Sequence, residues 1–474
     1  MSALGQTPAV VIPDLSELPG RVVRPGDDGY DAARRSWNHL FLHRPAAVVY
    51  PQSTPDVVAA VDWARNAGVP LRVRGGGHCL EGWSTLDDGL VIDVGHLDSV
   101  SIDTDARTAT VGAGVSQAAA VAALGAAGFA APTGTEGSVG LAGATLGGGF
   151  GLLTRAFGMA CDNLLAVEIV VAAGADAGAG SDGGAGAITV DADHHGELLR
   201  ALRGAGNGSF GVVTALTYAV HPLSQVSSVR VTWPSPDVLA EVFDVWQRTA
   251  PFVDDRLTSQ LEITRGSIVL SAVLASGDEQ EALRMLEPLL AIDSPDVVTA
   301  DAPWAETYAG FQIPPGDEPA NWKFRSQFVT EPFPPEAIAV IHSFLASAPA
   351  DGCNYFTNAF GGVVPQSEPR GGSAFAHRDA LFYAEPGAGW GIRGGVPASD
   401  DPLTPVCRAW VAAFAAALEP YTNGAYPNVP NADAVTWATD YWGPDIARLS
   451  AVKRAYDPAD AFRFEQSVPL HPFG

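Results

Sequence analysis

Hydrophobic residues in the first half of the chain follow helical spacing in some segments and strand spacing in others. In segment 54–68, TPDVVAAVDWARNAG, Pro55 stands near the start, Val57 and Val61 lie about one helical turn apart, and Gly68 follows the last turn. This arrangement predicts a helix. The same pattern predicts further helices at 116–128 and 198–202, and short strands at 71–73, 89–94, 109–115, 165–172 and 211–220.

The pattern changes after His221 and Pro222. Val229, Val231 and Trp233 alternate with other residues, as they do in a strand with one buried face. Residues 237–247 and 279–291 have helical spacing, and residues 373–385 predict a long strand. We therefore expect an α+β protein with a first domain at 1–222, a second domain with an antiparallel sheet at 223–424, and a C-terminal segment at 425–474.

Composition and charge narrow the class of protein. The 474 residues are 47% hydrophobic and 17% charged, which is enough apolar material for buried cores and argues against disorder. Acidic residues outnumber basic residues by 53 to 27, so the formal net charge is −26 at pH 7. A body this negative repels phosphate backbones, and a nucleic-acid partner is not expected.

No membrane partner, metal site or disulfide framework is predicted either. The N-terminus lacks the basic start and apolar core of a signal peptide, and no apolar run reaches about 18 residues. His194 and His195 stand in a polar turn typical of a solvated loop. We expect a cytoplasmic protein whose four cysteines lack metal-ligand spacing: Cys79, Cys161, Cys353 and Cys407.

Three glycine-rich stretches lie within about 80 residues of one another. They are RGGGH at 74–78, PTGTEGSVG at 132–140 and GATLGGGFG at 143–151. Consecutive glycines let several backbone N–H groups turn toward one point, and such a nest binds pyrophosphate. The pattern indicates a long ligand held between backbones, and the alternative is a set of tight turns in a β-rich protein.

One glycine pattern is misleading. Gly206, Gly208 and Gly211 spell G-x-G-x-x-G, but the strand-like sequence VVTALTYAV follows them. A dinucleotide fingerprint must follow a strand and open a helix. Tight-turn packing is therefore the better interpretation of these glycines.

Four segments together resemble the FAD-linked oxidases of the berberine-bridge-enzyme type. These segments are RVRGGGH, GATLGGGFGLLTRAFGMACDNL, ALRGAGNGSFGVVT and YWGPDIARLSAVKRAYDPADAFRFEQSV, in the family's order. The family belongs to the vanillyl-alcohol-oxidase superfamily with a PCMH-type FAD domain. The resemblance implies a two-domain fold with an FAD-binding domain at 1–222 (core about 42–222), a substrate domain at 223–424, and a C-terminal segment that returns to the FAD domain.

The resemblance implies that His78 bonds covalently to the 8α carbon of the flavin. In doubly linked relatives a cysteine just before a V-G-x-x-G segment forms a second bond. Here that position holds Glu136, and a carboxylate cannot form the thioether. The chain is thus closer to the histidine-only subgroup, with hydroxynicotine oxidase and some polyketide-tailoring flavoenzymes. Cys161 is interpreted as a buried apolar residue, and Asp162 and Asn163 as residues that hold backbone geometry.

The resemblance also implies a set of FAD-binding residues, most of them small. Packing is the alternative role for Val139. Whether Gln466 contacts the flavin is left open by the sequence. The set consists of Arg74, Gly75, Gly76, Gly77, His78, Gly82, Trp83, Pro132, Thr133, Gly134, Ser138, Val139, Gly140, Gly143, Gly147, Gly148, Gly149, Gly151, Val213 and Gln466.

The catalytic base is expected in the second domain. Strand alternation would place Leu381, Tyr383 and Glu385 on one face, and either Tyr383 or Glu385 could take a substrate proton. The alternative is an amphipathic strand with a solvated face. Many relatives carry a base tyrosine near the C-terminus where this chain has Val429, and Tyr426 nearby is interpreted as structural.

The function expected from these features is an FAD-dependent oxidase. Hydride would leave a small organic substrate, an alcohol, an amine or an activated C–H compound, and O2 would be reduced to hydrogen peroxide. The alternatives are a flavin-dependent dehydrogenase or oxygenase, and a non-catalytic flavin-carrying protein.

Overall fold

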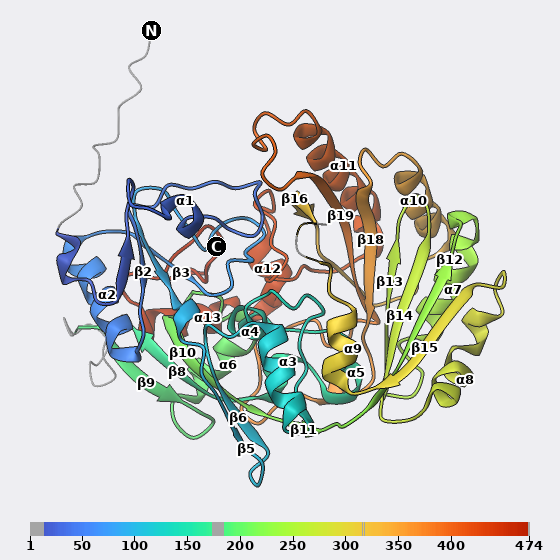
Figure 1. The fold of residues 1–474 in the computed structure, drawn as a ribbon, viewed down its shortest axis with the longest axis horizontal. Coiled ribbons are helices and arrows are strands. Elements are labelled where there is room, and N and C mark those ends of the chain that lie inside the picture. The colour runs from blue at the N-terminus through green and yellow to red at the C-terminus, as the bar shows by residue number, and fades with distance from the viewer. Residues whose placement is uncertain (1–13, 173–183, 315, 317, 473–474) are drawn as a thin grey trace.

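Two small β-sheets and one large sheet form the framework of the protein (Figure 1). The computed structural model describes residues 14–172, 184–314, 316 and 318–472. In Figure 1 the large sheet stands beside the two small ones, so the molecule has two halves. A two-stranded pair joins β7 (Phe129–Ala130) to β11 (His221–Pro222), which ends the first half of the chain.

The first sheet has the strand order β1-β2-β4-β3. Helix α2 (Thr54–Ala67) connects β2 to β3, with Ser53 capping its start and Gly68 in the left-handed conformation at its end. Strands β3 and β4 run parallel, so their last residues, Arg74 and Asp93, are register partners. The strands are β1 (Arg21–Val23), β2 (Ala47–Tyr50), β3 (Leu71–Arg74) and β4 (Leu90–Asp93).

The second sheet is antiparallel, with the order β5-β6-β10-β8-β9. It shares one hydrophobic core with the first sheet and with helices α3 (Gln117–Ala126) and α6 (Gly196–Ala205). Strand β10 follows Gly211 directly, so the G-x-G-x-x-G pattern opens no helix, as predicted. The strands are β5 (Val100–Asp103), β6 (Thr108–Gly112), β8 (Leu164–Val171), β9 (Gly186–Val190) and β10 (Val212–Ala219).

The third sheet is antiparallel and holds eight strands, in the order β15-β12-β14-β13-β18-β19-β16, with β17 also paired to β19. Side chains on one face, such as Phe382, pack with Trp246 and Phe414 in an apolar core under helices α7 (Leu239–Thr249), α8 (Glu279–Leu290), α10 (Pro335–Ala346) and α11 (Leu403–Leu418). The strands are β12 (Val226–Trp233), β13 (Leu257–Ile263), β14 (Ile268–Ala275), β15 (Asp296–Ala302), β16 (Pro319–Phe324), β17 (Gln327–Val329), β18 (Gly352–Ala359) and β19 (Phe382–Ile392).

The opposite face of the third sheet is more polar and contacts the first half of the molecule. Gln260, Asn358 and Tyr383 are register partners on adjacent strands. The amide of Gln260 donates to Asn358 Oδ1 at 2.7 Å and to Thr135 Oγ1 at 3.1 Å. This face therefore looks toward the loops of the first half.

Shorter helices complete the fold, and the last two return to the first half. Buried residues of α12 (Trp437–Trp442) and α13 (Ile446–Tyr456) belong to the same core as the first two sheets. Lys453 donates to the carbonyl oxygens of Ser209 and Phe462 and pairs with Asp457, which binds the C-terminal segment to that half. The other short helices are α1 (Tyr30–Ala33), α4 (Leu141–Leu146), α5 (Thr154–Phe157) and α9 (Trp304–Gly310).

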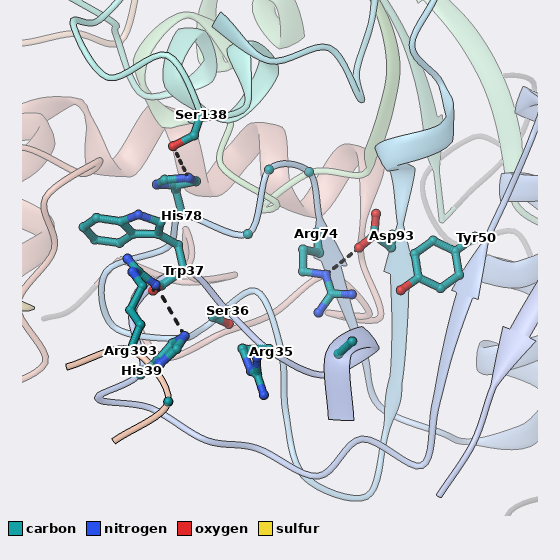
Figure 2. A pocket seen from close by; sticks show the side chains of 15 residues that line it. Arg35, Ser36, Trp37, His39, Tyr50, Arg74, His78, Asp93, Ser138 and Arg393 are labelled. Atoms are coloured by element: carbon teal, nitrogen blue, oxygen red, sulfur yellow. Dashed lines mark hydrogen bonds and ion pairs between the residues drawn. The ribbon is translucent and has the colours of Figure 1, made fainter. Parts of the chain in front are cut away.

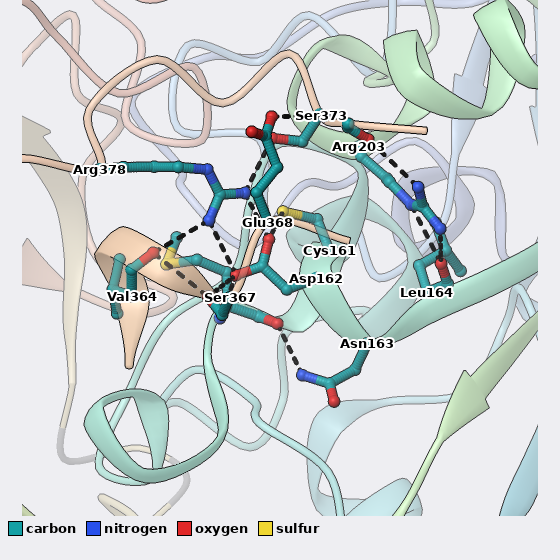
Figure 3. Close-up of polar contacts among 12 residues, drawn as sticks. Cys161, Asp162, Asn163, Leu164, Arg203, Val364, Ser367, Glu368, Ser373 and Arg378 are labelled. Atoms are coloured by element: carbon teal, nitrogen blue, oxygen red, sulfur yellow. Dashed lines mark hydrogen bonds and ion pairs between the residues drawn. The ribbon is translucent and has the colours of Figure 1, made fainter. Parts of the chain in front are cut away.

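The predicted strand at 373–385 was wrong in its position. Strand β19 begins only at Phe382, because residues before it contact other parts of the molecule, among them Arg378 and Asp162 in Figure 3. Arg378 forms an ion pair with Asp162, with Nη2 2.5 Å from Oδ1. His377 contacts the carbonyl oxygen of Asp440 at 2.9 Å. As a result Leu381 packs toward the apolar core under the helices, and it does not share a face with Tyr383.

No helix among the described residues is both long and apolar enough to span a bilayer. Most of the glycine-rich segment 174–186 lies outside the described residues.

Candidate functional site

A cavity of about 810 Å³ opens where strands β3 and β4 end (Figure 2). Its volume is within the range of small-molecule sites. The glycine loop that follows β3 forms one wall, and the segment that follows α1 forms another. The lining residues are Ala32, Arg35, Ser36, Trp37, His39, Tyr50, Arg74, Gly75, Gly76, Gly77, His78, Asp93, Ser138, Arg393 and Gly394.

Two glycines in the loop that forms this wall of the cavity are needed for different physical reasons. A β-carbon placed on Gly76 would lie 2.4 Å from the amide nitrogen of Gly140, so the two backbones touch. Gly77 has a φ of +72°, which side chains other than glycine rarely adopt. The loop can therefore turn sharply against the 132–140 stretch and present His78 at the cavity.

The His78 imidazole is held between a ring and a hydroxyl group (Figure 2). Trp37 stacks on it with ring centroids 4.9 Å apart, and His78 Nε2 lies 3.0 Å from Ser138 Oγ. Ser138 Oγ also donates to the Glu136 carboxylate at 2.6 Å. Burial lowers the pKa of His78 to about 4, so the imidazole is neutral at pH 7.

The loop after His78 is tied to the third sheet. Glu81 and Lys323 on β16 form a buried ion pair. The buried Asn38 side chain donates to the carbonyl oxygen of Leu80 at 2.8 Å and accepts from the Trp322 amide at 3.0 Å. His78 therefore stands where the two halves of the molecule meet.

Trp37 is fixed in turn by a charged pair. Its indole N–H donates to Glu318 Oε2 at 3.0 Å, and Arg393 Nη2 donates to the same oxygen at 2.9 Å. The Arg393 guanidinium also lies over the Trp37 ring, 5.4 Å from its centroid. This arrangement restrains the ring that covers His78.

At the other end of the cavity, Arg74 has unused hydrogen-bonding capacity. Its Nε donates to Asp93 at 2.5 Å and its Nη2 donates to the carbonyl oxygen of Ala33 at 2.6 Å. Among the described residues, buried Arg74 Nη1 and the hydroxyl of Ser36 have no partner. Unsatisfied buried donors beside a cavity are suited to an anionic ligand group.

A second group of candidate residues lies on strand β19. The Tyr383 hydroxyl donates to Glu385 Oε2 at 2.5 Å, so the two side chains share a face as predicted. The Tyr383 ring packs against Phe150 and Tyr426, with centroids 4.7 and 5.8 Å away. Burial raises the pKa of Glu385 to about 7, while the hydrogen bond from Tyr383 lowers it in part. Burial also raises the pKa of Tyr383, which remains protonated at neutral pH.

Comparison with known proteins identifies the cofactor and the family. Residues 45–175 match the FAD binding domain model, and residues 425–469 match the model described as berberine and berberine like. The FAD-linked oxidoreductase YgaK of Bacillus subtilis, which is uncharacterised, is 35% identical over 96% of this chain and 98% of its own length. The chain belongs to the berberine-bridge-enzyme-like family of FAD-linked oxidoreductases.

Other relatives agree with this assignment. The (R)-6-hydroxynicotine oxidase of Paenarthrobacter nicotinovorans is 30% identical over 95% of this chain and 97% of its own. The solved structure of Physcomitrella patens BBE-like 1 superposes with a TM-score of 0.86 and 27% identity, covering 96% of this chain and 98% of that one. The predicted two-domain α+β fold and the FAD cofactor are thereby confirmed, and the protein is an enzyme of the oxidoreductase class.

The cavity residues fit FAD. The dinucleotide carries a pyrophosphate, and the free Nη1 of Arg74 and the glycine loop offer donors for it. Of the residues that the sequence associates with FAD, this cavity brings six together, and they lie on two of the three glycine-rich stretches. They are Arg74, Gly75, Gly76, Gly77, His78 and Ser138.

The third glycine stretch has a different neighbourhood. The Gly149 amide donates to the Tyr426 hydroxyl at 2.8 Å, and Asn428 donates to the same hydroxyl at 2.7 Å. A β-carbon on Gly147 would lie 2.1 Å from Asn428 Oδ1. These contacts bind the C-terminal segment to the stretch and agree with a structural role for Tyr426.

The remaining predicted cofactor residues do not line the His78 cavity. Trp83 and Gln466 border a separate cavity of about 20 Å³, where Gln466 is engaged with Tyr441 and Asn431. Gly82 has a positive φ, and a β-carbon there would lie 2.6 Å from Phe41, so packing alone requires a glycine. The others border neither cavity: Pro132, Thr133, Gly134, Val139, Gly140, Gly143, Gly147, Gly148, Gly149, Gly151 and Val213.

Two structural predictions for the 159–163 segment agree with the structure (Figure 3). Cys161 is fully buried and unpaired. The Asp162 carboxylate accepts from the Met159 amide and from Arg378, and Asn163 donates to the carbonyl oxygens of Phe157 and Met159. Within the described part of the chain, no cluster of histidine, cysteine and acidic side chains could hold a metal ion.

Sequence reasoning missed Trp37, Arg393 and Glu318. Nothing in the local pattern around them indicates a ligand site, since each acts through a residue far away in the chain. Asp93 was also missed, although a signal was available. It ends a buried apolar strand, and the carboxyl ends of parallel strands are where α/β folds place ligands.

Proposed function

We propose that the protein is an oxidase that holds FAD covalently through His78 and oxidises a small organic substrate, with O2 as the electron acceptor. The observation that carries the proposal is the state of His78. It is a neutral imidazole at the end of a glycine loop, stacked by Trp37 and facing a cavity of suitable volume. A neutral imidazole is a competent nucleophile for such a bond.

In this proposal the two halves of the molecule have different roles in binding cofactor and substrate. Arg74 and the amides of the glycine loop bind the pyrophosphate, and His78 anchors the ring system. The flavin supplies a two-electron acceptor that can pass its electrons to O2. The first domain (1–222) with the C-terminal segment (425–474) binds the cofactor, and residues 223–424 form the substrate chamber.

Glu385 is the proposed general base. Its pKa of about 7 lets it exist as a carboxylate at neutral pH and still accept a proton from a hydroxyl or amine group. Tyr383 donates to the same carboxylate and fixes its orientation. The aromatic rings of Phe150 and Tyr426 pack against Tyr383 and limit the access of water to it.

Attachment of the cofactor is tested by acid precipitation of the purified protein. We expect the pellet to stay yellow and peptide mapping to place the flavin on His78. The variant His78→Ala should release all its colour, whereas His194→Ala, which changes an exposed histidine, should retain it. A colourless wild-type pellet would refute the covalent bond.

The oxidase reaction is tested separately. Alcohols, amines, phenols and sugars are screened for O2 consumption with hydrogen peroxide formation. Equal amounts of both are expected with any substrate that is turned over. Turnover that needs an artificial acceptor and yields no peroxide would indicate a dehydrogenase.

A further inference from the structure

Ser138 can only accept a hydrogen bond from His78. A serine hydroxyl has one proton to donate, and that of Ser138 points to Glu136 Oε1 at 2.6 Å. His78 Nε2 lies 3.0 Å from the same oxygen. Since the proton of the hydroxyl is already used, the proton in this second contact comes from the imidazole.

A neutral imidazole carries a proton on one nitrogen only. With that proton on Nε2, the lone pair is on Nδ1. None of the described residues forms a hydrogen bond with Nδ1. The nucleophilic nitrogen is therefore the one that the protein leaves free, and the protonated nitrogen is the one it engages.

We propose that Glu136 and Ser138 are positioning residues for attachment of the flavin: they hold His78 as the Nε2–H tautomer and take up its Nε2 proton as the bond forms. This inference rests on the proposed function. It also gives Glu136 a role of its own at the position where doubly linked relatives carry a cysteine.

Atoms and electrons balance in the reaction that attaches the flavin to His78. One C–H bond of the 8α methyl group and the Nε2–H bond of His78 break, and one C–N bond forms at Nδ1. Two electrons and two protons are released. Dioxygen, which the oxidase reaction also requires, takes them up as hydrogen peroxide. Ser138 and Glu136 provide the path by which the Nε2 proton leaves.

The first test follows the rate of attachment. Full-length protein is prepared without flavin and mixed with FAD, and covalently bound flavin is measured after denaturation at successive times. In Glu136→Gln and Ser138→Ala we expect attachment to be about 10- to 100-fold slower, by analogy with the loss seen when a group that orients a metal-bound histidine is removed. Glu331→Gln, which changes an exposed glutamate elsewhere, should match the wild type.

Two further readouts separate positioning from a general loss of structure. The variants should bind FAD non-covalently and unfold at the wild-type temperature, and Glu136→Asp should recover part of the rate. Nitrogen-15 NMR of histidine-labelled protein prepared without flavin should show the Nε2–H tautomer of His78 in the wild type and a mixture in Ser138→Ala.

The outcomes are distinguishable. Wild-type attachment rates in both variants, or an Nδ1–H tautomer in flavin-free wild-type protein, would overturn the role of Glu136 and Ser138 and leave the proposed function intact. A wild-type protein without flavin on His78 would overturn the proposed function itself. If Glu136→Gln does not fold, Ser138→Ala decides the question.

Discussion

The side chains around His78 and those around Glu385 have different effects on the group that they surround. Around His78, charged and polar groups from both halves of the molecule fix one ring: the Lys323–Glu81 pair, Asn38 and the Glu318–Arg393 pair. Around Glu385, the hydroxyl of Tyr383 donates to the carboxylate, and aromatic rings pack against Tyr383. The first region keeps an imidazole neutral and immobile, whereas the second raises the proton affinity of an acid. The difference indicates that anchoring and proton transfer can be disrupted independently.

The largest effect is expected from Glu385→Gln. Without a carboxylate the proposed base is lost, and kcat should fall by about 10²- to 10⁴-fold. Covalent flavin content should not change, because His78 lies in the other region. The control is Glu262→Gln, an exposed glutamate on the same face of the sheet. Steady-state kinetics check this prediction, and an unchanged kcat would remove Glu385 from the mechanism.

Breaking the charged support of the His78 loop should affect stability more than chemistry. Lys323→Met leaves Glu81 buried without its partner, which costs about 3–5 kcal/mol of unfolding free energy. Arg448→Met breaks an exposed pair with Glu197 and should cost about 0–1 kcal/mol. Denaturant unfolding measures both variants. Equal losses would contradict the view that burial gives the Lys323–Glu81 pair its importance.

The glycine loop can be tested by adding one methyl group. Gly76→Ala would push a β-carbon against Gly140, and overpacking of this kind costs about 1–3 kcal/mol. Gly266→Ala is the matched control, because its β-carbon would have no neighbour within 4 Å and Gly266 is not among the predicted FAD-binding residues. Slower flavin attachment is expected in Gly76→Ala only. If both variants behaved as the wild type, contact between the two backbones would not shape the site.

The smallest expected effect concerns the pH profile. With a base of pKa about 7, kcat/KM should rise as the pH increases through 7 and level off above it. The Tyr383 hydrogen bond stabilises the charged carboxylate and lowers this pKa, so Tyr383→Phe should move the rise to higher pH by about one unit. The pH dependence of kcat/KM in both proteins checks the shift. A shift to lower pH would contradict the assigned donor.

Local sequence patterns predicted many of the elements around the site. The helix at α2 was expected because Pro55, Val57, Val61 and Gly68 form a complete local signal, and its bounds agree within one residue. The strand before Tyr383 was misplaced because Arg378 and His377 draw the segment toward groups more than 60 residues away in the sequence. The periodicity of hydrophobic residues within a segment cannot indicate contacts with residues so far away in the sequence.

The sequence by itself determined the cofactor, the α+β class and the glycine loop that ends in His78, because each depends on residues adjacent in the chain. Only the tertiary structure decided the protonation of that histidine. Trp37, Glu136, Ser138 and Lys323 come from segments distant from His78, and Lys323 is 242 positions away from its partner Glu81. Burial and hydrogen-bond direction, which set proton affinity, arise only when such segments meet.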